Sequence, residues 1–166
     1  MINELLLSEF DEEVKKTRAM LERVPIKADF KPHPKSAALG KLAPHVAELP
    51  GFGVTILTTP EHDFAASGPR PRPPFESSEQ LVKAFEEGAA KTRAALKTLP
   101  DSAWTEPWKL SFGGKTIFSG SRFLAYRQMF LNHLVHHRAQ LGVYLRLNDV
   151  PLPSTYGPSA DDSMGF

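Results

Sequence analysis

Residues 119–147 read SGSRFLAYRQMFLNHLVHHRAQLGVYLRL, and this stretch decides the fold class of the chain. Its large side chains recur at spacings of three and four, which is the period of one face of an α-helix. The stripe consists of Phe123, Tyr126, Phe130, His133, Leu134, His137, Leu141, Tyr144 and Leu145. Because two histidines belong to this apolar stripe, the stretch predicts both a buried helix face and a candidate site.

The two stripe histidines, His133 and His137, are four residues apart. Residues at this spacing stack about one turn above each other, with roughly 5 to 6 Å between their Cβ atoms, so both imidazoles can reach one metal ion. His136 lies on a mixed face and is interpreted as a flanking residue. The spacing alone leaves two interpretations open, which are metal ligation and core histidines satisfied by hydrogen bonds.

Length and charge bound the class of protein. A chain of 166 residues fits a single domain, residues 1–166, and is long enough to bury a core without disulfides. Its 20 basic and 19 acidic residues nearly cancel, so no basic surface for nucleic acid is expected. Residues 148–166 are rich in Pro, Gly and Ser, and are predicted to form an extended tail that wraps the bundle or frays.

Cysteine usage and the N-terminus bear on location. The sequence has no cysteine, which excludes disulfides and thiolate ligands and fits a reducing compartment. Its first residues, MINELLLSEFDEEVKK, lack the basic and then apolar layout of a signal peptide, and no run of eighteen apolar residues occurs. These features predict a cytoplasmic protein without a membrane partner.

Three further helices are predicted before the long one. The first covers 2–24 and ends at a proline; the second covers 36–59 with Ser36 as its N-cap; the third runs from a cap at Ser77 or Ser78 to residue 99. The second contains two prolines, each costing roughly 3 kcal/mol inside a helix. It is therefore expected to be kinked, or to begin near residue 44.

The connections set the predicted topology. Residues 25–35 and 60–76 are Pro-rich and are predicted to be long, irregular connections in which His33 and His62 are solvated. Residues 104–118 alternate around Gly113-Gly114, a pattern typical of a small β-hairpin before the last helix. Two long connections favour an all-α, up-up-down-down four-helix bundle.

His45 is the remaining candidate. It follows Pro44 and precedes Leu49 by one turn, so it can face inward; alone it is better explained as a hydrogen-bonded helix histidine. Glu-x-x-His, which a di-iron bundle needs, does not occur, and the zincin motif is absent because no Glu follows His133. His45 matters only if the fold brings it to the histidines of the last helix.

Four features in this order resemble a known family. The first long helix, GKLAPHVAELPGF at 40–52 with its histidine, the aromatic and glycine hairpin, and NHLVHHRAQLGVYLRLNDVPLPSTYGPSAD at 132–161 are together similar to the DinB/YfiT-like superfamily of small metal-binding helical bundles. The most specific part is HHRAQLGVYLRL followed by VPLP, which matches the final helix and exit loop of that family. The likeness spans most of residues 1–160.

The resemblance implies a three-histidine site. The family's ligand from the second helix falls on His45, and its His-x-x-x-His pair falls on His133 and His137. These residues would bind a divalent ion, nickel or zinc, with water completing the shell. Three neutral imidazoles leave the ion an open position, where it can lower the pKa of bound water to about 7 or hold a thiol as thiolate.

Two functions follow from that implied site. Characterised relatives include thiol S-transferases and a mycothiol-dependent isomerase, so the first expectation is transfer of a low-molecular-weight thiol to an electrophile, with hydrolysis as a variant. The alternative is a non-catalytic, metal-binding or stress-related dimeric bundle, because no general acid or base stands beside the ligands; no catalytic residue is assigned. Homodimers are common among the relatives.

Three polar residues lie near the predicted ligands. Glu48 and Gln140 are positioned to orient ligand imidazoles, although both could equally be solvated. Arg138 is expected to serve a helix-end or surface role.

Overall fold

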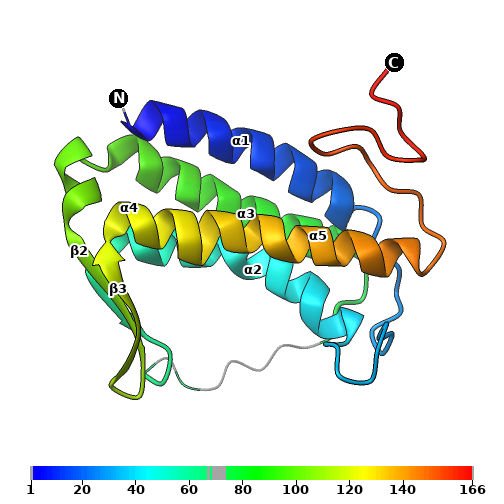
Figure 1. Ribbon diagram of the computed structural model, residues 1–166, viewed down its shortest axis with the longest axis horizontal. Helices are drawn as coiled ribbons and strands as arrows, with labels where there is room; N and C mark the ends of the chain where they lie inside the picture. Colours follow the sequence, from blue (N-terminus) through cyan, green and yellow to red (C-terminus); the bar gives the residue numbers. More distant parts are fainter. Residues whose placement is uncertain (1, 67, 69–73, 166) are drawn as a thin grey trace.

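The computed structural model describes residues 2–66, 68 and 74–165 and shows long helices packed side by side with a small sheet at one end (Figure 1). The predicted mostly helical architecture is confirmed. The elements in chain order are α1 (Ile2–Leu21), α2 (Leu39–Thr58), β1 (Glu61–Asp63), α3 (Ser78–Thr98), the 3-10 helix η1 (Asp101–Thr105), β2 (Pro107–Phe112), β3 (Lys115–Ser121), α4 (Arg122–Leu124), the π-helical segment η2 (Ala125–Leu131) and α5 (Asn132–Arg146).

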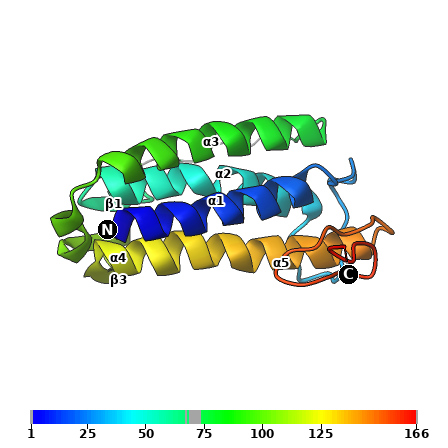
Figure 2. The ribbon, with the colours of Figure 1, turned by 90° about the horizontal axis from the view of Figure 1, so that it is seen from above.

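The helices run in the order up, down, down, up, so the predicted up-up-down-down order is wrong. Figures 1 and 2 show α1 and α5 running in one direction, with α2 and α3 running in the other. Side-chain contacts agree: Glu9 of α1 pairs with Arg127 of η2, and Glu13, one turn later, pairs with Arg138 of α5. α1 and α5 are therefore parallel, whereas the predicted order would make the first and last helices antiparallel.

The first long connection explains the error in topology. Residues 22–38 turn back at one end of the bundle instead of crossing it, because the start of α2 bonds to them directly. The N–H of Leu39 donates to the Phe30 carbonyl at 2.9 Å, and the N–H of Gly40 donates to the Ala28 carbonyl at 2.8 Å. Only the connection between α2 and α3 joins opposite ends of the bundle. That connection includes residues 67 and 69–73, which lie outside the described residues.

A three-stranded sheet replaces the predicted hairpin. β2 and β3 are antiparallel as expected, but β1, from within the predicted 60–76 connection, pairs in parallel with β2 and places His62 opposite Leu110. Gly113 and Gly114 form the β2–β3 turn with φ of +56° and +81°, values that favour glycine. The Asp63 carboxylate accepts both of their N–H groups, and backbone hydrogen bonds, foremost that from Gly114, lower the pKa of Asp63 to about 2.

α2 is one helix despite its internal prolines. It begins at Leu39, upstream of Pro44, and Figure 1 shows it bending in its middle, so the kinked alternative is the one observed. Its N-cap is Ala38, without a side-chain capping bond, and not the predicted Ser36. His45 therefore sits on a continuous helical scaffold.

The other predicted helix ends are close to those observed. α1 ends at Leu21, three residues before the predicted 24. α3 begins after Ser77, whose hydroxyl accepts the Gln80 N–H, so the predicted serine cap is confirmed.

The last helical run differs from a regular α-helix. Between α4 and α5 the chain forms the π-helical turns of η2, in which each bond spans one more residue than in an α-helix. This extra residue rotates the positions upstream of the histidines. Phe123, which a 3.6-residue period places in the stripe, is 37% exposed, whereas Leu131, outside that stripe, is buried. From His133 onward the predicted stripe is retained.

The buried core lies between the helices and under the sheet. Its largest fully buried side chains are Trp104, Trp108, Tyr126, Phe10, Phe85 and Phe130. Residues 148–165 form no helix or strand and fold back along the end of α5, where Asp161 pairs with Arg146. The tail therefore wraps the bundle, which is one of its two predicted arrangements, and does not fray. None of the helices described is both long and apolar enough to cross a membrane.

Candidate metal centre

Three histidines from two helices converge at the contact between α2 and α5. The Nε2 atom of His45 lies 3.4 Å from that of His133, which lies 2.7 Å from that of His137. One ligand nitrogen from each residue lies within 4.8 Å of the others, and all three side chains are half-buried. The structure thus assembles the three residues that the sequence singled out.

A glycine allows the two helices to approach this closely. A Cβ atom at Gly53 of α2 would lie 2.8 Å from the ring of Phe130 in η2, closer than real Cβ atoms come to other atoms. The missing side chain lets the aromatic ring pack directly on the α2 backbone. His45 lies two turns before Gly53 on α2, and His133 lies just after Phe130, so the close contact brings the histidines within reach.

Hydrogen bonds on the far side of each ring fix which nitrogen faces the centre. His133 Nδ1 lies 3.3 Å from the Met129 carbonyl, and His137 Nδ1 lies 2.7 Å from Gln140 Oε1. Both oxygens are acceptors, so each Nδ1 carries the proton and donates. Each Nε2 is then unprotonated and presents a lone pair, which is the form of histidine that binds metal.

The facing lone pairs are an arrangement that a cation would stabilise. With both Nδ1 atoms protonated, no proton remains between the Nε2 atoms of His133 and His137, which are only 2.7 Å apart. Burial lowers the pKa of both histidines, and nearby histidines lower it further, so the charged imidazolium is disfavoured. A positive ion between the nitrogens would relieve this repulsion.

The spacing fits a divalent transition metal. Zinc binds histidine nitrogens at about 2.0 to 2.1 Å, which places tetrahedral ligand atoms about 3.3 Å apart. The 3.4 Å between the Nε2 atoms of His45 and His133 matches this ligand-to-ligand distance. The 2.7 Å between the Nε2 atoms of His133 and His137 would increase by about 0.6 Å on metal binding. Imidazole donors suit zinc, nickel, copper and iron, whereas magnesium and calcium prefer oxygen. The residues present therefore fit a transition-metal ion.

The other histidines lie outside the triad. His136 is exposed, with its ring 4.8 Å from that of His137, and flanks the centre as predicted. His33 is exposed in the first connection, also as predicted. His62 is not simply solvated: it is half-buried in β1, with its ring 6.0 Å from that of Phe52. That prediction failed because nothing in the Pro-rich connection at 60–76 indicates a strand.

The two polar residues predicted to orient the ligand imidazoles, Gln140 and Glu48, differ in their surroundings. Gln140 bonds to His137 through Nδ1, so it acts as the orienting partner that its position suggested. Glu48, although one turn from His45, is exposed.

Comparison with known proteins identifies the family. The sequence pattern of the DinB family matches residues 1–164. The chain belongs to the DinB family. A DinB-like protein from Bacillus cereus ATCC 10987 has a similar structure, with a TM-score of 0.67, 18% identity and coverage of 90% of this chain and 95% of that one. A DinB-like protein from Bacillus subtilis also has a similar structure, with a TM-score of 0.63, 16% identity and coverage of 87% of this chain and 92% of that one.

Both likenesses are below 25% identity and concern the fold. No protein among those with curated functions matches this DinB-family chain.

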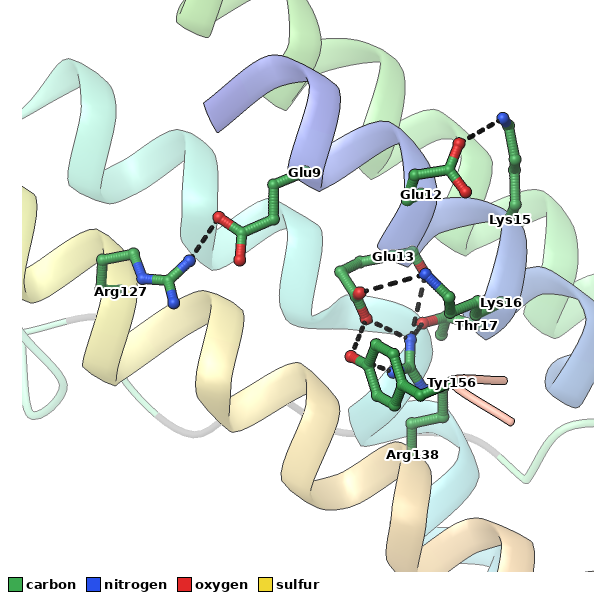
Figure 3. Close-up of polar contacts among 9 residues, drawn as sticks. All are labelled: Glu9, Glu12, Glu13, Lys15, Lys16, Thr17, Arg127, Arg138 and Tyr156. Atoms are coloured by element: carbon green, nitrogen blue, oxygen red, sulfur yellow. Dashed lines mark hydrogen bonds and ion pairs between the residues drawn. The ribbon is translucent and has the colours of Figure 1, made fainter. Parts of the chain in front are cut away.

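Arg138 has a different role from the one expected in this DinB bundle. It is 2% exposed, and its guanidinium contacts Glu13 of α1 at 2.6 Å, so the predicted helix-end or surface role is wrong. Figure 3 shows the pair capped by Tyr156 from the tail, whose hydroxyl accepts from Arg138 at 2.8 Å and donates to Glu13 at 2.7 Å. Thr17 also accepts from Arg138 at 3.1 Å. Because Arg138 follows His137, this cluster fixes α5 against α1 beside the candidate ligands.

One sequence signal could have revealed this cluster. Glu13 is three residues after Phe10 and four before Thr17, so it lies within the buried stripe of α1. A carboxylate in a buried stripe needs a partner, because an unpaired buried charge is costly. Arg138 is the basic residue nearest the centre of the last helix, and the pair could have been proposed from these two positions. Nothing local indicated that Tyr156 would join them.

Proposed function

We propose that this DinB-family protein is a metal-dependent enzyme that transfers a low-molecular-weight thiol to an electrophile, with hydrolysis as the nearest variant. The observation that carries the proposal is the convergence of ring nitrogens from His45, His133 and His137 at a half-buried helix contact. All three metal-binding groups are neutral imidazoles, and the site is only half-buried, so solvent and substrate can reach it. Both features favour a reactive metal centre over a closed structural one.

The protein residues have separate roles in this proposal. The three histidines would hold a nickel or zinc ion, Gln140 would orient His137, and the Met129 carbonyl would orient His133. An ion held only by neutral imidazoles keeps its full positive charge and supplies a Lewis acid that favours the deprotonated form of a thiol or of water. The orienting bonds keep the ring nitrogens aimed at one point, so binding requires little rearrangement.

The nucleophilic thiol must come from a second molecule, because the chain has no cysteine. A small cellular thiol is available in reduced form in the cytoplasm, which is the location we propose. Transfer to a halogenated aromatic electrophile would form a carbon–sulfur bond and release halide. The active-site side chains need not form a covalent intermediate.

Turnover is tested with metal-loaded protein, one of three thiols (bacillithiol, mycothiol or glutathione) and a halogenated aromatic electrophile, with halide release as the readout. We expect turnover with one thiol, its loss in His137→Ala, and its retention in His136→Ala, which alters the exposed neighbouring histidine. Rates equal to those of His137→Ala with all three thiols would refute thiol transfer. Hydrolysis of an activated ester by the same preparation would then support the variant.

A non-catalytic metal-binding bundle is the second candidate. It is favoured by the make-up of the site, since the group of possible ligands among the described residues consists of His45, His133 and His137 and includes no carboxylate. Stoichiometric metal without turnover of any thiol or ester would support this function. We also propose a homodimer, which sedimentation of the metal-loaded protein tests.

A further inference from the structure

A second candidate site lies on the opposite side of α5 from the histidines. The structure contains a cavity of about 470 Å³ between the outer face of α5 and residues 152–159 of the tail. Val135 and Ala139 line it, and at 100° per residue these positions lie about 120° to 160° around the helix from His133 and His137. Its volume is within the range of small-molecule sites, about 300 to 1,000 Å³.

The walls of the cavity are mainly apolar. Val135, Ala139, Val143 and Leu147 follow one another at intervals of four residues, which forms a straight apolar ridge along α5. Val143 is 57% exposed and Leu147 is 55% exposed, so the end of the ridge nearest the C-terminus of α5 is open to solvent. Leu152 and two prolines of the tail form the facing wall. An elongated apolar group lying on this ridge would remove exposed carbon from water.

The charged residues of the cavity have one sign. Arg138 and Arg146 line it, and its described lining contains no Asp or Glu. Arg138 is held in place by Glu13, as shown in Figure 3. Arg146 is 44% exposed and pairs with Asp161, which lies outside the lining. Asp161 engages the two terminal nitrogens of Arg146, and a guanidinium has five N–H donors in total, so an incoming anion can share Arg146 with Asp161.

From this combination we infer that the cavity binds a free amphipathic molecule with an elongated apolar body and a single anionic group, of the carboxylate class. The apolar body lies along the α5 ridge under the tail, and the anionic group contacts Arg146 at the exposed end. Arg138, already neutralised by Glu13, shapes the wall without being the main anion contact. This site does not depend on metal binding or on the proposed activity.

Three probes with the same chain separate charge from apolar burial. Decanoate, decanol and decyltrimethylammonium are titrated into the full-length protein below their aggregation concentrations and followed by calorimetry and amide chemical shifts. We expect one decanoate per chain, with shifts at α5 and the tail. Decanol and the cation are expected to bind at least fivefold more weakly. Equal affinity for all three probes, or shifts away from the cavity, would overturn the inference.

Two substitutions test the geometry. Arg146→Gln is expected to weaken decanoate binding about five- to tenfold and to leave decanol binding unchanged, since only the anion uses the guanidinium. Ala139→Phe, at an exposed position, is expected to fill the cavity and weaken both. Arg18→Gln is the matched control, because Arg18 is a similarly exposed, ion-paired arginine outside the cavity. Unchanged decanoate binding in the first two variants, or equal loss in the control, would refute the proposal.

Discussion

Removal of the Glu13 carboxylate is predicted to cause a large loss of stability. Glu13 is 5% exposed and Arg138 is 2% exposed, so Glu13→Ala leaves a buried guanidinium without its countercharge and leaves the Tyr156 hydroxyl without its acceptor. Breaking one side of a buried ion pair costs about 3 to 5 kcal/mol. For a domain of this size that corresponds to a fall in Tm of about 6 to 20 °C.

The assay is urea unfolding of the wild type, Glu13→Ala and a matched control. Glu12→Ala removes the neighbouring carboxylate, which is exposed and pairs only with Lys15 among the ion pairs described, and should leave stability almost unchanged. Adding Arg138→Met to Glu13→Ala removes the uncompensated charge and should recover part of the loss. A Glu13→Ala variant as stable as Glu12→Ala would refute the claim that this pair joins α1 to α5.

The same cluster has a predicted pH dependence. Burial raises the pKa of Glu13, but the Tyr156 hydroxyl and the Arg138 guanidinium outweigh it and hold this pKa below the ordinary value of 4.5. A depressed carboxyl pKa stabilises the fold above its unfolded value, and the stabilisation disappears as pH falls through the folded pKa. The stability gap between wild type and Glu13→Gln should be constant from about pH 7 to 5 and narrow below about 4.5. A gap that widens in acid would contradict this assignment.

Two further substitutions test the frame of the site. Gly53→Ala should destabilise the protein by about 1 to 3 kcal/mol in urea unfolding because its Cβ would meet the Phe130 ring, whereas Gly51→Ala, with no atom within 4 Å, should be neutral or slightly stabilising. Gln140→Leu removes the hydrogen bond to His137 and should weaken metal affinity about 10- to 100-fold in a competitive chelator titration; unchanged affinity would show that the bond does not orient the ligand.

Periodicity predicted the parts of the structure that depend on local sequence. The stripe from His133 to Leu145 is retained in α5, and the Ser77 cap begins α3, because helix faces and caps are decided within a few residues. The pairing of His133 with His137 follows from the same local geometry. The place of His45 did not follow from spacing, and was anticipated only through the resemblance to the DinB family.

Features that depend on distant contacts were missed. β1 forms because Glu61–Asp63 pairs with β2 almost fifty residues later, and nothing in a three-residue strand signals this. The helix directions depend on whether residues 22–38 turn back or cross the bundle, which is decided by hydrogen bonds to the start of α2. The π-helical turns in η2 shift Phe123 outward in a way that a 3.6-residue period cannot describe.

The central claim is that His45, His133 and His137 bind one divalent metal ion. Elemental analysis of untagged protein after exposure to nickel or zinc and removal of excess ion tests it most directly, with single alanine variants of the three histidines and of His136. We predict about one equivalent of metal in the wild type and in His136→Ala, and loss of most of it in each of the other three variants. Absence of bound metal in the wild type, or equal retention in His45→Ala, would contradict the account.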